Sequence, residues 1–410
     1  MKILLVTENA YCGGLDSFII TLINHWPYSE DELVLMCNAG HPGLEVIRAQ
    51  LRRRCQIIGH QYPLPWSTQD VPQSRFMRML RAPFRILGRQ WLFLDYLRKF
   101  RRVFDELAAD RLLVINGGYP AGLTCRAATV AWGLAGRRPL SVHNFHNFAH
   151  PARWWERIFE NAIDSRVHAY AKAMVSVSRI CADSLCSRPA FVGSSKRMYI
   201  YNGIEFREGC QDGPRMVRAG LGVAEQAPMC LMLGTYESRK GHGFLLQAFQ
   251  RVVWLRPDAR LVVCGFGYPS EIRHVRAVVD ALGLQKQVRL EGFRQDVADL
   301  LEASDLLLVP SQSSESFGLT IVEAMSHQVP VIATRVGGMP EVLQDGEGGF
   351  LVEPDDVDGF AERMLQLIND EALRQQQGAR GRRRFEQNFR AQRMVQEYAD
   401  LVRDGRSMIA

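Results

Sequence analysis

Short apolar runs separated by longer mixed stretches recur along all 410 residues, and this alternation strongly limits the folds available to the chain. In the first half the runs are residues 3–7, 33–37, 112–116, 140–142, 174–177 and 198–201. The series begins again with residues 229–233, 260–264, 288–291, 306–309 and 331–334. Such runs are typical of strands buried on both faces of a parallel sheet, with helices between them. The sequence therefore predicts an α/β protein with two doubly wound domains.

Turn-forming residues separate the two series of strands. The segment from Asn202-Gly203 to Gly213-Pro214 is rich in residues that favour turns. We therefore predict a first domain at residues 1–203, a second domain at residues 204–385 and a terminal helix at residues 386–410.

The end of the chain, from residue 358 to about residue 402, has a helical composition. Glycine is a poor helix former, so we expect a break near Gly378 to Gly381. A chain of 410 residues is too long for a single hydrophobic core, which agrees with two domains.

Positive charge is concentrated in the first half. Residues 1–205 carry 26 Lys and Arg against 16 Asp and Glu, whereas residues 206–410 carry 24 against 28. The stretch 75–104 is basic, contains one acid, Asp95, and is interleaved with large apolar side chains such as Trp91. This pattern suits contact with an anionic membrane, and the alternative is a helix whose apolar stripe packs on its own domain. Nucleic acid is not expected as a partner, because no recognition motif accompanies the basic stretch.

Cysteine usage and hydropathy favour a cytoplasmic location. The nine cysteines are scattered and never spaced Cys-x-x-Cys, so neither a disulfide nor a zinc framework is predicted. No apolar run is long enough to span a bilayer, and the first run ends at Glu8, too early for a signal peptide. We expect a cytoplasmic protein that attaches peripherally to the inner face of the plasma membrane.

Two glutamates, Glu315 and Glu323, follow the apolar run at residues 306–309. Glu315 is predicted on the loop after that strand, and Glu323 one turn into the next helix, after Gly318. Ligands of open α/β sheets bind beyond the carboxyl ends of the strands. Two carboxylates at this place favour a polar ligand that is rich in hydroxyl groups.

Five segments, taken together, resemble the retaining glycosyltransferases of the GT-B fold called family 4, or glycosyl transferases group 1. Glu315-Ser-Phe-Gly-Leu-Thr-Ile-Val-Glu323 resembles that family's Glu-x7-Glu signature, and Gly337-Gly338 follows it at the family's spacing. Gly234-Thr-Tyr-Glu-Ser-Arg239-Lys240-Gly241 resembles its cationic loop. The remaining similar segments are residues 288–296 (the base-binding turn), 201–204 (the interdomain linker) and Gly13-Gly14 (the first glycine loop). The resemblance implies two Rossmann-like domains facing a cleft, with the C-terminal helix crossing back to the first domain.

The resemblance implies roles for the charged residues of the second domain. Lys240 would offset the charge that grows on a diphosphate leaving group. Glu323 would accept hydrogen bonds from the donor ribose as an ionised carboxylate, and Glu315 would lie near the transferred sugar. Thr235 stands where the family usually has an arginine. Arg239 either supplies this second cation or the charge is lost.

Backbone groups have implied roles as well. The N–H groups of Phe317, Gly318 and Leu319 at a helix start would face the phosphates. Gly292 and Arg294 would line the base. In the first domain Gly13 and Gly14 would reach the diphosphate, and Asp16 would cap or orient their loop.

His143 is predicted to end the strand at residues 140–143, and the resemblance implies that it contacts the transferred sugar. His146 and His150 follow in the same segment and remain alternatives. We expect no metal site, because the three histidines leave a strand into a loop and no Asp-x-Asp motif is present. No other cofactor is predicted.

The resemblance implies an enzyme that transfers a sugar from a nucleotide diphosphate donor, with a UDP- or GDP-sugar expected. The reaction would be retaining and metal-independent. The acceptor would be a saccharide or lipid-linked saccharide in the assembly of bacterial lipopolysaccharide, capsule or exopolysaccharide. The alternatives are a phosphorylase or sugar-phosphate synthase of the same fold, and a non-catalytic scaffold that binds sugar nucleotides.

Overall fold

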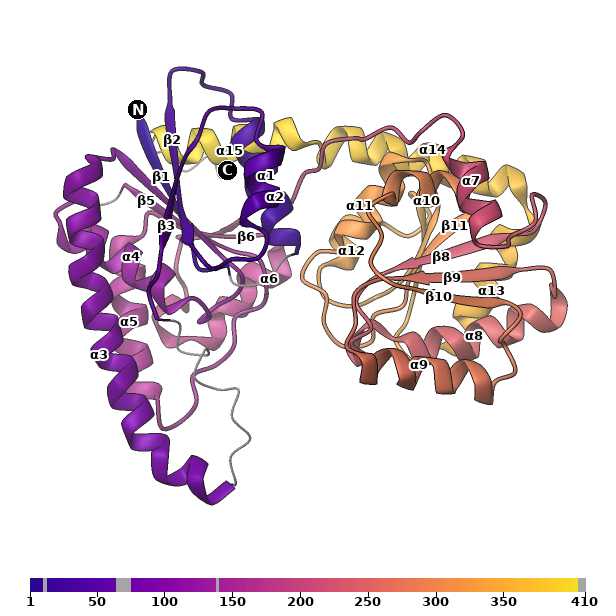
Figure 1. The fold of residues 1–410 in the computed structure, drawn as a ribbon, viewed down its shortest axis with the longest axis horizontal. Helices are drawn as coiled ribbons and strands as arrows, with labels where there is room; N and C mark the ends of the chain where they lie inside the picture. Colours follow the sequence, from indigo (N-terminus) through magenta and orange to yellow (C-terminus); the bar gives the residue numbers. More distant parts are fainter. Residues whose placement is uncertain (10–12, 64–74, 138–139, 405–410) are drawn as a thin grey trace. The chain divides into compact units, whose positions relative to one another are not determined.

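Two compact units, each built around its own parallel sheet, make up the computed structural model (Figure 1). The structure describes residues 1–9, 13–63, 75–137 and 140–404, with the side chains of 75–87 and 404 excepted. The first unit comprises residues 1–202 and the chain from residue 391 onward, and the second comprises residues 203–390. Both are doubly wound, Rossmann-like domains, which confirms the predicted fold class.

The first unit contains a seven-stranded parallel sheet in the order β3-β2-β1-β4-β5-β6-β7. Its strands are β1 (Lys2–Thr7), β2 (Glu32–Asn38), β3 (Gln56–His60), β4 (Arg111–Asn116), β5 (Ser141–Phe145), β6 (Ala173–Ser176) and β7 (Arg197–Tyr199). Its helices up to the boundary are α1 (Gly14–Asn24), α2 (Leu44–Gln50), α3 (Arg75–Leu107), α4 (Leu123–Leu134), α5 (Arg157–Tyr170) and α6 (Arg179–Asp183). Strands β1, β2 and β4 are almost completely buried, as expected for a sheet covered by helices on both faces.

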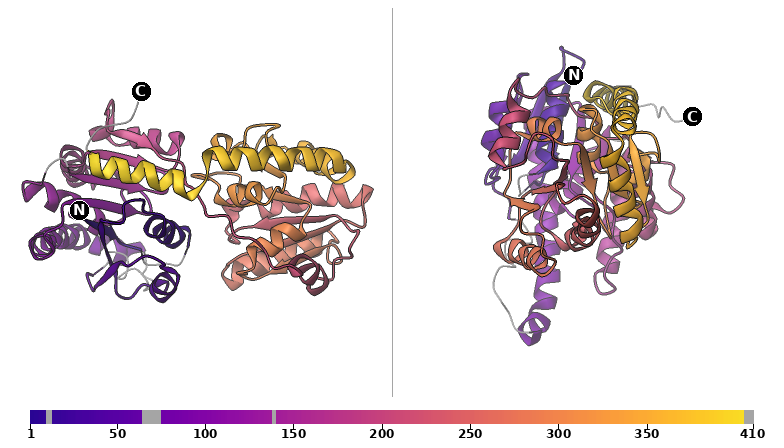
Figure 2. Two further views of the ribbon diagram at one scale, coloured as in Figure 1. Left: turned by 90° about the horizontal axis from the view of Figure 1, so that it is seen from above. Right: turned by 90° about the vertical axis from the view of Figure 1, so that its right-hand side faces the viewer.

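The last described helix, α15 (Ala391–Asp404), belongs to the first unit (Figures 1 and 2, yellow). Its apolar residues recur at helical spacing, so one stripe faces inward. Met394, Val395 and Tyr398 are fully buried in the core formed with β1, β2 and α1. The hydroxyl of Tyr398 accepts a 2.6 Å hydrogen bond from the Asn144 side chain on β5.

The second unit contains a six-stranded parallel sheet in the order β10-β9-β8-β11-β12-β13. The strands are β8 (Met229–Leu233), β9 (Arg260–Cys264), β10 (Val288–Glu291), β11 (Leu306–Val309), β12 (Val331–Thr334) and β13 (Gly349–Val352). The helices are α7 (Gly213–Gly220), α8 (His242–Leu255), α9 (Pro269–Ala281), α10 (Val297–Ala303), α11 (Leu319–Ser326), α12 (Met339–Val342), α13 (Val357–Asn369) and α14 (Glu371–Asn388). The central strands β11 and β12 are buried along their whole length.

The predicted break in the C-terminal helical region is misplaced. Helix α14 continues through Gly378 and Gly381, and the helical region is interrupted at Asp370 and near residues 389–390. A Cβ atom on Gly378 would lie 2.0 Å from the carbonyl oxygen of Gln328. Glycine therefore allows α14 to approach the rest of the unit closely, and packing offsets its poor helix propensity.

Candidate functional site

Three strands of the second sheet end side by side on glycines, where ligands of such sheets bind. The Gly234 N–H after β8 donates to the Cys264 carbonyl at 3.0 Å, and the Gly265 N–H after β9 donates to the Gly292 carbonyl at 3.2 Å. A Cβ atom on Gly265 would lie 1.8 Å from the Gly234 carbonyl oxygen. The loops after β8 and β9 therefore approach each other at a distance that only glycine permits, and a backbone hydrogen bond joins the β9 loop to the turn after β10.

Lys240 and Glu315 meet at this edge, although 75 residues separate them in the sequence. The Lys240 Nζ lies 2.5 Å from Glu315 Oε2, and both side chains are largely buried. Gly241 follows with φ of 78°, and a Cβ atom there would lie 1.9 Å from the Pro310 carbonyl oxygen after β11. This backbone conformation presses the Lys240 loop against the end of β11 and positions the ammonium beside the carboxylate.

Two glycines hold the backbone of Glu315 in place. The Gly338 N–H donates to the Glu315 carbonyl at 2.8 Å. Gly337 has φ of 56°, and a Cβ atom there would lie 2.0 Å from the same carbonyl oxygen. The Gly-Gly pair that follows the Glu-x7-Glu signature therefore serves to hold the Glu315 backbone closely.

Arg239 has a different partner from Lys240. Its Nε lies 2.6 Å from Glu237 Oε2, and one of its terminal nitrogens donates to the Ser314 carbonyl at 3.3 Å. The Thr235 hydroxyl donates to the other oxygen of Glu237 at 2.9 Å. Thr235, at the family's arginine position, and Arg239 thus share one carboxylate, which neutralises the arginine.

Helix α11 begins directly after Gly318, which has φ of 96°. Leu319 is the first helical residue, so backbone N–H groups are exposed to a ligand at this end of the helix. The Phe317 side chain is 2% exposed and its ring packs edge-on against Phe389 at 5.9 Å. The Phe317 ring is therefore not available to a ligand.

Glu323 lies one turn into α11 and is partly buried. Burial raises the pKa of its carboxyl to about 7, and the charge of Arg207 acts in the opposite direction. The sequence predicts an ionised carboxylate here. The structure instead gives a group that is about half protonated near neutral pH.

The turn after β10 carries the predicted base-binding residues. Arg294 forms a two-point ion pair with Asp296, with Nε and Oδ1 separated by 2.9 Å. Phe293, between Gly292 and Arg294, is 72% exposed. Our reading of the sequence missed a further feature near this turn: Phe266 and Tyr268, after β9, are also exposed, and their rings lie 5.8 Å apart. In the sequence, these exposed aromatic residues could have been found as aromatic residues that directly follow the glycines at the strand ends.

The first glycine loop is organised by Asp16, as predicted. The Gly13 N–H donates to Asp16 Oδ2 at 3.2 Å, and the Asp16 N–H donates to the Gly13 carbonyl at 3.0 Å. The other carboxylate oxygen of Asp16 binds the Asn9 side chain at 2.5 Å and His41 Nε2 at 2.9 Å. Gly14 is the first residue of α1, and residues 10–12 lie outside the described part of the chain.

The predicted position of His143 at the end of a strand is wrong. Strand β5 extends to Phe145, so His143 lies inside it and is fully buried, with Nδ1 2.8 Å from the Thr129 hydroxyl. Burial and the charge of Arg126 lower the pKa of His143 to about 3. His146 is the residue that leaves the strand, half-buried and edge-on to Phe18 at 4.3 Å. The contact proposed for His143 with a sugar stays a prediction, and His146 has the strand-end position on which that prediction rests.

Glu8, just after β1, is a candidate residue that the sequence reading passed over. It is 5% exposed and accepts a 2.6 Å hydrogen bond from the Thr124 backbone and another from the Thr124 hydroxyl. Burial raises the pKa of Glu8 to about 7. An acid that directly follows a buried strand was the available signal.

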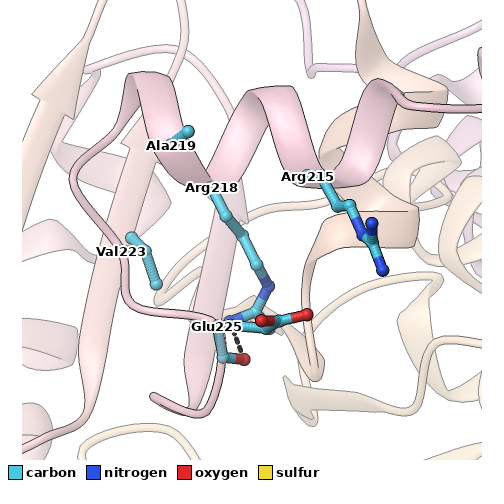
Figure 3. Close-up of a pocket in the computed structure, with 5 residues that line it drawn as sticks. All are labelled: Arg215, Arg218, Ala219, Val223 and Glu225. Atoms are coloured by element: carbon cyan, nitrogen blue, oxygen red, sulfur yellow. Dashed lines mark hydrogen bonds between the residues drawn. The ribbon is translucent and has the colours of Figure 1, made fainter.

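A shallow pocket of about 300 Å³ beside α7 contains none of the predicted residues (Figure 3). It is lined by Arg215, Arg218, Ala219, Val223 and Glu225. Arg218 donates to the Ala303 carbonyl at 2.8 Å and pairs with Asp305 at 3.1 Å, so its charge serves the structure of the domain.

Two further observations on the described residues concern metal ions and membranes. Within them, no group of three or more His, Cys, Asp or Glu side chains is arranged to hold a metal ion. No helix in the same part of the chain is both long and apolar enough to cross a bilayer.

Comparison with known families agrees with the fold. Residues 216–384 match the family described as Glycosyl transferases group 1, and residues 13–208 match Glycosyltransferase Family 4. The two matches cover the second and first units respectively. The chain therefore belongs to the group 1 glycosyltransferases of the GT-B fold.

Individual relatives match over part of their length. The chain is 34% identical over 212 residues to N-acetyl-alpha-D-glucosaminyl L-malate synthase of Bacillus anthracis, which covers 51% of this chain and 55% of that protein. It is 30% identical over 185 residues to the lipopolysaccharide core biosynthesis glycosyltransferase LpsE of Rhizobium meliloti, covering 45% of this chain and 52% of that protein. The chain thus spans about half the length of these curated relatives.

A solved structure shares the fold across the whole chain. HepE from Anabaena, in complex with UDP, has a TM-score of 0.76 and is 20% identical to this chain. The likeness covers 98% of this chain and 100% of HepE. At 20% identity, this similarity is evidence for a shared fold alone.

Proposed function

We propose that this chain is a retaining glycosyltransferase that moves a sugar from a nucleotide diphosphate donor to a saccharide or lipid-linked saccharide acceptor. The observation that carries the proposal is the 2.5 Å pair of Lys240 and Glu315, held at the sheet edge by Gly241 and Gly337. A cation suits the phosphates of such a donor, and a carboxylate beside it suits the hydroxyls of the attached sugar. The names of the curated relatives, which transfer sugars, support this class of reaction.

The donor would bind mainly to the second unit. Lys240 and the N–H groups at the start of α11 would meet the diphosphate, and Glu323 would accept hydrogen bonds from the ribose. Phe293 is exposed after β10, and Phe266 and Tyr268 are exposed after β9. Their aromatic rings offer flat apolar surface for the base. We propose a UDP- or GDP-sugar, and the UDP complex of HepE supports the first of these.

In the reaction, the bond between the anomeric carbon and the leaving phosphate oxygen breaks while the acceptor oxygen forms a bond on the same face. The acceptor proton moves to the leaving phosphate oxygen. Lys240 and the α11 amides would stabilise the negative charge on the departing diphosphate, so the protein's own groups would replace a metal ion. Glu315 is engaged with Lys240, which favours this front-face route over attack by an enzyme carboxylate.

The acceptor is proposed to belong to bacterial surface polysaccharide assembly. The name of LpsE, a lipopolysaccharide core biosynthesis glycosyltransferase, supports this choice. The chain would work in the cytoplasm, where nucleotide sugars are made, and meet a lipid-linked acceptor at the inner face of the membrane.

A donor panel tests the proposal. Purified protein would be incubated with UDP-, GDP- and ADP-sugars and an acceptor extract, with released nucleotide measured and products identified by mass spectrometry. Lys240→Ala is expected to lower turnover by about 10²- to 10³-fold, because one charge-stabilising group is lost from the transition state. Lys286→Ala is the matched control, since Lys286 is the other lysine of the second half and is exposed.

The outcomes separate the alternatives. Equal turnover in Lys240→Ala and wild type would refute the assigned role of Lys240. Donor binding without nucleotide release would indicate a scaffold, and a sugar phosphate formed only with added phosphate would indicate a phosphorylase. An unchanged rate in the presence of EDTA is expected for the metal-independent reaction.

A further inference from the structure

The basic helix predicted to contact a membrane contributes much of its apolar surface to the protein core. On α3, Phe93, Tyr96, Phe100 and Phe104 are at most 5% exposed. Their spacing forms one helical stripe, and Phe104 meets Trp132 of α4 edge-on at 5.0 Å. These residues therefore cannot enter a bilayer. The side chains of residues 75–87, the first part of this stretch, lie outside the described residues.

A different apolar set remains exposed on α3 and at the beginning of α5. It consists of Trp91 and Leu94 on α3, and Trp154, Trp155 and Ile158 at the α5 start, which we call the tryptophan surface. Their side chains are 64%, 53%, 81%, 48% and 91% exposed, respectively. Exposure of three tryptophans and two aliphatic residues is costly in water, so a binding role is a better explanation than chance.

Contacts between the two segments bring the parts of the tryptophan surface into one region. The rings of Phe93 on α3 and Phe159 on α5 meet edge-on at 6.1 Å. Arg89 on α3 pairs with Glu156 at 3.2 Å and with Glu160 at 3.1 Å. Each exposed residue lies within two positions of one of these contacting residues, so the tryptophan surface belongs to the part of the domain where α3 meets the α5 start.

Positive charge surrounds this region. Exposed arginines on the same two segments are Arg98, Arg101, Arg102, Arg153 and Arg157. The guanidinium of Arg153 lies 5.7 Å from the Trp155 ring centroid. Among the acids of these segments, Asp95 pairs with Lys99 at 2.6 Å and Glu156 with Arg89, whereas Asp105 and Glu106, further along α3, are exposed. The surface therefore combines interfacial aromatic residues with unbalanced positive charge.

We propose that the tryptophan surface docks the first domain onto the surface of a bilayer that contains anionic lipid. Tryptophan prefers the headgroup region, where its ring is buried and its N–H remains hydrated. Arginines around it attract anionic headgroups, which supplies the charge complementarity that selects a membrane over an uncharged partner. This inference goes beyond the proposed reaction and holds for any donor sugar.

Vesicle flotation tests this docking. The full chain would be mixed with vesicles of phosphatidylcholine, alone or with about one third phosphatidylglycerol, at about 0.1 M salt. Wild type is expected to float with the anionic vesicles and to be released by high salt. The double variant Trp154→Ser/Ile158→Ser and the double variant Arg153→Glu/Arg157→Glu are each expected to lower the partition coefficient at least about tenfold.

A matched pair of exposed residues controls for loss of apolar surface in general. Trp254 and Leu255 of the second unit are 72% and 69% exposed, so Trp254→Ser/Leu255→Ser should float like wild type. Thermal unfolding of all variants should be unchanged, because the substituted side chains are exposed. Nucleotide release with a soluble acceptor should persist in the surface variants, so failure of docking and failure of the proposed reaction are distinguishable.

Several results would overturn the proposal. These are no flotation of wild type with anionic vesicles, equal binding by wild type and both double variants, or an equal loss in the Trp254 control. Equal flotation with uncharged vesicles would overturn the selection for anionic lipid. Loss of binding in the arginine variant alone would indicate a purely electrostatic contact without insertion of the tryptophans.

Discussion

The carboxyl of Glu323 should make the stability of the wild-type protein fall, and its affinity for the donor rise, as the pH increases. Glu323→Gln, which cannot ionise, tests both effects. Burial raises the pKa of Glu323 from 4.5 to about 7, so the folded protein holds this proton more tightly than the unfolded chain. The resulting stabilisation is fully present below about pH 4.5 and is lost as the pH rises through about 7. The difference between the two pKa values corresponds to at most about 3.5 kcal/mol. Above pH 7, Glu323→Gln is therefore expected to be more stable than wild type.

Donor affinity should have the reverse pH dependence in wild type. Ribose hydroxyls donate to a carboxylate more strongly than to a protonated carboxyl, so binding requires the ionised form. About a tenth of Glu323 is ionised one unit below its pKa, and affinity should fall by up to about tenfold per pH unit below 7. Glu323→Gln should bind with little dependence on pH and more weakly at about pH 8, by about 1–3 kcal/mol.

Two assays over about pH 5.5 to 8.5 measure these effects: urea unfolding for stability, and calorimetric titration with a nucleotide sugar for affinity. A nucleotide sugar is preferred to a free nucleotide because its diphosphate diester does not titrate in this range. His143 and His242 do not interfere, since burial lowers the pKa of His143 to about 3 and that of His242 to about 4. Glu8→Gln is the control, because Glu8 has a similar pKa in the other unit. A flat affinity profile in wild type, or the same slope in Glu323→Gln, would refute the reasoning.

Two further predictions concern packing. Gly241→Ala should lower the free energy of unfolding by about 1–3 kcal/mol and reduce turnover, because the φ of Gly241 is 78° and the new Cβ would meet the Pro310 carbonyl. Gly283→Ala is the control: Gly283 has φ of 70° but lies in open space, so this variant should show the backbone strain without the loss of turnover. Tyr398→Phe should cost about 1–2 kcal/mol in urea unfolding, because the buried Asn144 amide loses its 2.6 Å partner. A stability equal to wild type in Tyr398→Phe, or full turnover in Gly241→Ala, would contradict these assignments.

The central strands were predictable because their residues are buried on both faces. The runs at 229–233, 260–264, 306–309 and 331–334 coincide with the central strands β8, β9, β11 and β12, and the run at 288–291 coincides with the edge strand β10. The two strands that the sequence reading missed, β3 and β13, lie at sheet edges. Strand β3 is only partly buried and β13 begins with a glycine, so neither has the uniform apolar signal of a central strand.

Polar residues inside β5 show why the remaining features of the fold and site could not be predicted from the local sequence. The sequence His143-Asn144 appears to end a strand, but both residues are fully buried in the structure. The Asn144 amide nitrogen donates to Tyr398, a partner 254 residues away, and no local pattern reveals such a contact. The same limit applies to the candidate site. Residue types placed Lys240 and Glu315 individually at strand ends, whereas their ion pair depends on the packing of the Gly241 loop against β11.

The return of α15 to the first unit has a consequence for biosynthesis. The ribosome releases the whole second unit before it releases Met394 and Tyr398, which fill the core between β1, β2 and α1. During translation the second unit has all of its strands available and can fold, while the first unit still exposes the apolar surface that α15 covers. The nascent first unit therefore exposes this apolar surface until α15 has emerged.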